Sequence, residues 1–91
     1  MYILKWLHRV EVKNWKEAEK VIEVAKEYGA SWKRGKAYGK PGDIRCVVYV
    51  EADAFSRDGC WGGLYMLRDI MPRRVPGAVV KGGEKVEVTL V

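Results

Sequence analysis

A chain of 91 residues with 48% hydrophobic and 32% charged side chains has room for one hydrophobic core, which predicts a single domain over residues 1–91. Its net charge of +5 excludes an acidic protein and makes a negatively charged partner worth considering. Glutamine is absent and asparagine and threonine occur once each, which is typical of hyperthermophile proteins, whose surfaces are filled by lysine and glutamate. Because heat adaptation also enriches lysine, the placement of the charges decides what the net charge means.

The apolar opening, MYILKWLHR, is too short to span a bilayer and its charges do not fit a signal peptide. We therefore expect a cytoplasmic protein without a membrane partner. Cys46 and Cys60 lack the paired spacing of zinc ligands, so no metal and no cofactor is expected. Two states of these cysteines stay open: free core thiols, which we favour, and a disulfide, which intracellular hyperthermophile proteins tolerate.

The first predicted element is a half-buried strand in residues 2–12, where apolar and charged side chains alternate. A helix follows from Trp15, with Asn14 as its N-cap and Glu17 in the capping-box position. Apolar residues at helical spacing continue to Tyr28, and Gly29 stands where a C-cap glycine belongs.

Residues 31–39 and 44–52 are predicted strands, and the turn sequence KPGD between them indicates a β-hairpin. The second of these strands, IRCVVYVEA, is rich in β-branched residues, as a central strand would be. A second helix is predicted over 56–71, with Ser56 as a possible N-cap and Pro72 as its stop. The end of the chain, 77–91, is either one bent strand or a hairpin.

The order strand-helix-strand-strand-helix-strand predicts an α+β domain of the ferredoxin-like class. In this βαββαβ sandwich both helices cover one face of a four-stranded antiparallel sheet, here with room for an extra C-terminal strand. The other face is left open or covered by a partner. Many unrelated functions use this arrangement, so the fold alone does not identify one.

The sequence contains no pattern of catalytic residues. His8 is the only histidine, and its place on the same strand face as Trp6 and Val10 favours a structural, hydrogen-bonded side chain. Ser31 and Ser56 have no nucleophile-elbow context, and the glycines of GCWGGLY match no phosphate-binding loop. We therefore expect a binding protein without enzymatic activity.

The predicted hairpin is the most basic part of the chain. Strand alternation places Trp32, Arg34, Lys36 and Tyr38 on one face. On the neighbouring strand Arg45, Val47 and Tyr49 point away from the core residues of that strand. Cations suit phosphates and flat aromatic faces suit unstacked bases, so this surface predicts binding of single-stranded RNA or DNA. The candidate nucleic-acid-binding residues are Trp32, Lys33, Arg34, Lys36, Tyr38, Arg45 and Tyr49.

A different orientation of the hairpin stays open. Trp32 and Tyr38 could instead cover a hydrophobic sheet edge while the lysines remain solvated, and a bulge near Gly35 would reverse the faces.

VVYVEA at 47–52 and MPRRVPG at 71–77 resemble the NGN domain of archaeal NusG-type transcription elongation factors. The resemblance covers about the last half of the chain and implies the same βαββαβ order. It also implies docking to transcription machinery, with Val50, Glu51 and Ala52 on a partner-pairing strand. The chain departs from the family at Cys46 and Val47 and in the sequence EVKNWKE after the first strand.

A second functional hypothesis is a protein-interaction or assembly domain. Here the open sheet face would be covered by a second copy or by a larger machine, because an exposed apolar sheet rarely stays uncovered. The candidate partner-binding residues are Leu7, Val47, Val50 and Glu51.

Overall fold

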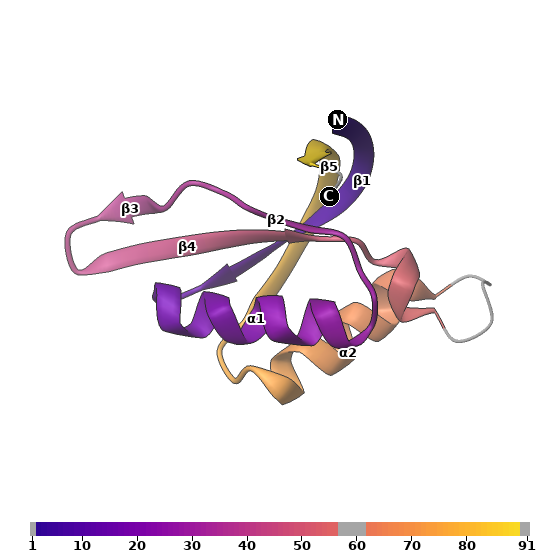
Figure 1. Cartoon of the computed structure of the whole chain (residues 1–91). Coiled ribbons are helices and arrows are strands. Elements are labelled where there is room, and N and C mark those ends of the chain that lie inside the picture. The colour runs from indigo at the N-terminus through magenta and orange to yellow at the C-terminus, as the bar shows by residue number, and fades with distance from the viewer. Residues whose placement is uncertain (1, 57–61, 90–91) are drawn as a thin grey trace.

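A computed structural model describes residues 2–56 and 62–89 of the chain. Figure 1 shows its helices and strands in chain order. They are β1 (Tyr2–Val12), α1 (Trp15–Glu27), β2 (Trp32–Arg34), β3 (Tyr38–Lys40), β4 (Asp43–Val50), the 3-10 helix η1 (Asp53–Phe55), α2 (Gly63–Arg74) and β5 (Val79–Thr89).

The domain is α+β, with a five-stranded antiparallel sheet and two α-helices. The strands lie in the order β2-β4-β1-β5, and β3 pairs with β4 beyond the end of β2. The hairpin predicted around KPGD is confirmed by the pairing of Lys40 with Asp43. The end of the chain is one strand, since β5 pairs with β1 from Val79 to Thr89.

The start and end of α1 confirm the predicted caps. Asn14 Oδ1 accepts a 2.9 Å hydrogen bond from the Glu17 backbone N–H, so one of the free N–H groups of the first turn is satisfied. At the other end Gly29 adopts a φ of +68°, and Ala30 N–H bonds to the carbonyl of Ala25 at 2.9 Å. This is the Schellman arrangement, which favours glycine because the left-handed conformation strains other residues.

The second helix differs from its prediction at both ends. It begins at Gly63, and Ser56 instead follows η1, so Ser56 is not the N-cap. A Cβ on Gly63 would lie 2.4 Å from the carbonyl oxygen of Ala52, so the helix approaches η1 too closely for any other residue. Pro72 lies inside the helix, which continues to Arg74 because only the last turn follows the proline and Val75 N–H still bonds to Met71 O at 2.8 Å.

The main core lies between the two helices and one face of the sheet. From the strands it contains Val10, Val12, Cys46, Val48 and Val50, which alternate along β1 and β4. Cys46 is a buried free thiol, and Cys60 lies outside the described residues. Burial of these side chains stabilises the fold by about 25 cal/mol per Å² of apolar surface removed from water.

The sheet does not stay flat on its other face. β4 pairs only with residues 8–12 of β1, and the rest of β1 continues with β5 as a two-stranded ribbon. This ribbon rises on the side of the sheet away from the helices (Figure 1). Its tip approaches β2, where Val88 and Thr89 line a cavity of about 590 Å³ together with residues 30–34. The sheet therefore encloses a concave face opposite its helices.

Candidate nucleic-acid groove

A groove of about 490 Å³ lies on the concave face of the sheet. β2 and the segment that follows it form one wall, β5 forms the other, and side chains of β1 and β4 form the floor. The lining residues are Arg9, Lys33, Arg34, Gly35, Lys36, Tyr38, Val47, Tyr49, Glu84, Lys85 and Val86. Five of the seven predicted nucleic-acid-binding residues thus line one hollow.

A bulge in the basic hairpin decides which side chains face this groove. Arg34 pairs with Val48 and Gly35 N–H bonds to Val47 O at 2.8 Å, whereas Tyr38 pairs with Arg45. Residues 36 and 37 therefore stand opposite Cys46 alone, so the hairpin strand has one extra residue. The extra residue reverses the alternation, and Tyr38 faces the groove.

The prediction that Trp32 and Arg34 share a face with Tyr38 is therefore wrong. Trp32 packs against the main core, with the Lys26 ammonium 5.6 Å from its ring centre. Arg34 forms an ion pair with Glu19 of α1 and lies over the ring of Trp15. Both side chains reach toward α1, and Arg34 borders the groove from the rim of β2.

A polar network covers the floor of the groove. The Tyr38 hydroxyl donates to Glu11 Oε1, and Arg9 Nη2 lies 3.0 Å from Glu11 Oε2. The guanidinium of Arg9 also lies 4.9 Å from the centre of the Tyr38 ring. Glu11 is buried, so its charge requires these two partners. These contacts fix the position of the Tyr38 side chain, and 44% of its surface stays exposed.

Tyr49 lies beside this network and is half-buried. Burial raises the pKa of its hydroxyl, and a hydrogen bond with Glu84 of β5 raises it further. Gly35 passes directly over the ring, because a Cβ at that position would lie 2.9 Å from Tyr49 Cε2. The ring is therefore held between β5 and the bulged segment, with its hydroxyl neutral and bonded at physiological pH.

The charge of the groove is mostly positive and partly unneutralised. Among the described residues, Lys33, Lys36 and Lys85 form no ion pair, whereas Arg9 and Arg34 are each paired with a glutamate. Glu84 is the one acidic residue of the lining. Lys85 stands opposite Trp6, so its side chain lies on the other face of the ribbon. Lys33 and Lys36 are therefore the unpaired cations that favour an anionic ligand in this groove.

Arg45 belongs to the same face but not to the groove. It is half-buried opposite Tyr38, and its Nε lies 3.8 Å from Asp43 Oδ1. Of the predicted set, Lys33, Lys36, Tyr38 and Tyr49 are thus the residues that the structure brings together around the groove with their side chains on the concave face.

Three of the four predicted partner-binding residues, Leu7, Val47 and Val50, are buried. Leu7 and Val47 face the concave side but are 0% and 3% exposed, and the backbone at Gly35 lies against Val47. Val50 and Ala52 belong to the main core. A partner that docks on this domain would therefore contact residues other than these three.

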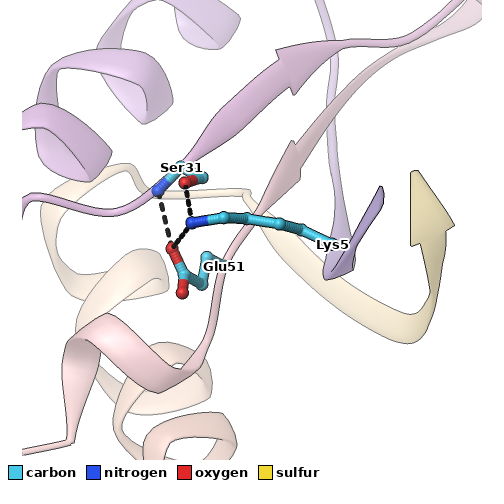
Figure 2. A network of polar contacts seen from close by, with 3 residues as sticks. All are labelled: Lys5, Ser31 and Glu51. Atoms are coloured by element: carbon cyan, nitrogen blue, oxygen red, sulfur yellow. Dashed lines mark hydrogen bonds and ion pairs between the residues drawn. The ribbon is translucent and has the colours of Figure 1, made fainter. Parts of the chain in front are cut away.

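Glu51 closes the curled sheet instead. Figure 2 shows Lys5 of β1 reaching across to Ser31 and Glu51. Lys5 Nζ donates to Ser31 Oγ at 2.8 Å and lies 3.6 Å from Glu51 Oε2, which accepts a 3.0 Å hydrogen bond from Ser31 N–H. The three residues join the ribbon to the start of β2, through Ser31, and to the end of β4, through Glu51. This arrangement fastens the ribbon over the concave face.

His8 is buried on the helix side of β1, where burial lowers its pKa and the nearby Arg68 lowers it further. The predicted hydrogen bond is missing at one ring nitrogen, since Nδ1 has no hydrogen-bond partner among the residues that the structure describes. In residues 2–56 and 62–89 there is no group of three side chains suited to a metal ion. No helix in the same part of the chain is long and apolar enough to cross a membrane.

Sequence reasoning missed the contributions of β1 and β5 to the groove. Arg9, Glu84, Lys85 and Val86 line it together with the hairpin residues. Charged and apolar residues alternate in both segments, which was the available signal. Only the pairing of β5 with β1 reveals that the two segments border one hollow.

The chain matches none of the known protein families, curated proteins or solved structures with which it was compared.

Proposed function

We propose that this domain binds single-stranded nucleic acid in the groove on its concave sheet face. The observation that carries the proposal is the combination of Lys33 and Lys36, which have no ion-pair partner among the described residues, with two tyrosines around one hollow of about 490 Å³. Lysines attract the phosphate backbone, and a tyrosine ring offers a stacking surface to any base. Tyr38 is the stacking candidate, because its ring is more exposed than that of Tyr49.

The tyrosines of the groove favour a single strand over a duplex. A duplex keeps its bases stacked and paired inside, whereas Tyr38 and Tyr49 line the groove and can contact only exposed bases. Unpaired bases can reach rings in such a hollow, and stacking contributes about 1–3 kcal/mol per base. The proposed ligand is thus an RNA or DNA strand with exposed bases.

The fold assignment that accompanies this function is the ferredoxin-like class. Taking β2 and β3 as one interrupted strand, the order β2-β4-β1-β5 corresponds to the strand order of a split βαβ domain with both helices on one face. Docking to transcription machinery, which the NGN resemblance implies, remains a second proposal. It would require a surface other than Val50, Glu51 and Ala52.

The test is charge reversal inside the groove against charge reversal outside it. In the double variant Lys33→Glu, Lys36→Glu we expect the affinity for a fluorescent oligonucleotide to fall at least about tenfold, because two phosphate contacts become repulsive. The slope of log affinity against log salt should become shallower by about 1.4, from about 0.7 for each lost single-strand contact.

The matched control is Lys16→Glu, Lys20→Glu on α1. It changes the net charge by the same amount on exposed residues of the helix side. Unchanged binding in the control with weakened binding in the groove variant supports the proposal. Equal losses in both variants, or binding that does not depend on salt, would show that the groove is not the binding site.

A further inference from the structure

A second hollow lies next to the groove, toward the end of the β3–β4 hairpin. Its volume is about 440 Å³, and it is lined by Lys13, Gly42, Asp43, Ile44 and Arg45. β1 pairs with β4 only as far as Cys46, so β3 is the one described strand that pairs with residues 43–45 of β4. The second hollow is therefore bordered by the free side of β4 and by Lys13, which follows the end of β1.

The groove and the second hollow follow one another along β4. Tyr49 and Val47 line the groove. Arg45 and Asp43 continue the same alternation along the strand, and both line the second hollow. Tyr38 of the groove stands directly opposite Arg45, so the two hollows meet at this cross-strand pair. Asp43 and Tyr49 are six positions apart, which at about 3.3 Å per residue gives a path of about 20 Å.

The second hollow carries more positive than negative charge. Lys13 is exposed and forms no ion pair with any residue that the structure describes. Arg45 Nε lies 3.8 Å from Asp43 Oδ1, and the Asp43 side chain is 80% exposed, so water screens this pair strongly. Lys40 is exposed and stands opposite Asp43 on β3. Three cations thus surround one carboxylate, which favours an anionic ligand here as in the groove.

Exposed apolar side chains accompany these cations. Ile44 lines the second hollow and is 50% exposed, and the Tyr38 ring lies at the boundary with the groove. A nucleotide combines an anionic phosphate with a flat base, so it can satisfy both kinds of side chain. An acidic peptide would neutralise the cations but would leave the ring of Tyr38 without a stacking partner.

We propose that a single strand of nucleic acid bound in the groove continues past Tyr38 into the second hollow, where Lys13 and Arg45 bind its phosphates. The inference rests on the proposed function, because it extends the same ligand along the same strand of the sheet. Tyr38 then lies between the two unpaired lysines of the groove and the two cations of the second hollow. Its ring stacks on a base in the middle of the bound strand, and the complete ligand is longer than the groove alone accommodates.

The dependence of affinity on strand length tests the proposal. Oligothymidylates from about 2 to about 12 nucleotides long are titrated against the whole chain. We expect the affinity to rise as the strand fills the groove, and to rise again by at least about fivefold once the strand reaches the second hollow. In Lys13→Glu the second rise should be lost, whereas short strands should bind as they do to the wild type.

Salt dependence gives an independent measurement of the same contact. For long strands, the slope of log affinity against log salt should become shallower by about 0.7 in Lys13→Glu, the value for one single-strand phosphate contact. For short strands the slope should not change. Arg45→Gln is a second variant that should also lose the second rise, and its thermal unfolding midpoint shows that it is folded.

Lys16→Glu is the matched control. Lys16 is exposed, lies in the first turn of α1 and lines neither the groove nor the second hollow. It follows Lys13 by three positions, so its replacement changes the net charge by the same amount in nearly the same part of the chain. Long strands should bind Lys16→Glu with wild-type affinity.

A single rise that ends when the groove is filled would overturn the proposal and leave the groove as the whole site. Equal losses in Lys13→Glu and Lys16→Glu, or displacement of long strands by a poly-glutamate peptide as readily as by unlabelled oligonucleotide, would also overturn it. Failure of the proposed function gives a different result. In that case Lys33→Glu, Lys36→Glu would keep wild-type affinity for strands of every length.

Discussion

Arg34 and Tyr38 lie on opposite faces of the sheet, although they are four positions apart in the same basic segment and simple alternation would put them on one face. Arg34 forms an ion pair with Glu19 of α1, and Tyr38 donates to Glu11 on the concave face. The extra residue after Gly35 is the cause, since it shifts the pairing with β4 by one position. The bulge therefore separates a structural cation from an aromatic residue that is free to contact a ligand.

Replacing Gly35 with alanine should destabilise the domain by about 1–3 kcal/mol, because the added methyl group would overpack the floor of the groove. Its Cβ would lie 2.9 Å from Tyr49 Cε2 and 3.0 Å from Val47 Cγ1. Denaturant unfolding measures the change. Gly82→Ala in β5 is the control, since no atom lies within 4 Å of the added Cβ, and a similar loss in both variants would contradict the account.

Tyr38→Phe should lower the free energy of unfolding by about 1 kcal/mol, because the buried carboxylate of Glu11 loses one of its two partners. The ring remains, so oligonucleotide binding should change less in Tyr38→Phe than in Tyr38→Ala. Thermal unfolding and a binding titration of the two variants test this separation of roles. Tyr65→Phe on the exposed side of α2 should leave both measurements unchanged.

Ser31→Ala should destabilise the domain by about 0.5–1.5 kcal/mol, because Lys5 loses a hydrogen-bond acceptor in a half-buried position. The contact of Lys5 with Ser31 and Glu51 is half-buried, whereas the ion pair of Arg73 with Asp69 is exposed and provides a comparison. Asp69→Asn should change stability by less than about 0.5 kcal/mol. Hydrogen exchange at the β1–β5 ribbon should accelerate in Ser31→Ala and stay unchanged in Asp69→Asn.

Acid should destabilise the domain through His8. Burial, and then the charge of Arg68, hold the pKa of His8 below its ordinary value of 6.5, although Asp53 acts in the opposite direction. The unfolded chain therefore binds a proton at His8 more readily than the folded chain does. The contribution of neutral His8 to the free energy of unfolding is complete above pH 6.5 and is lost as the pH falls through the folded pKa. Unfolding midpoints across this range should fall less steeply in His8→Gln than in the wild type.

The local elements could be read from the sequence because their signals are local. Asn14 and Gly29 supply the caps of α1, and their hydrogen bonds involve residues within one turn. KPGD closes a hairpin between adjacent strands. The start of α2 was misplaced because Gly63 is required by a contact with Ala52, which no local pattern displays.

The sequence by itself determined the α+β composition of this protein, the order of its main elements and the concentration of positive charge in the hairpin. Only the tertiary structure decided which side chains share a face, because a single bulged residue reverses the alternation from Arg34 to Tyr38. It also decided that Leu7 and Val47 are covered while Tyr2, Leu4 and Trp6 are exposed. Alternation along a strand divides side chains into two sets, but the curl of the ribbon selects the set that water reaches.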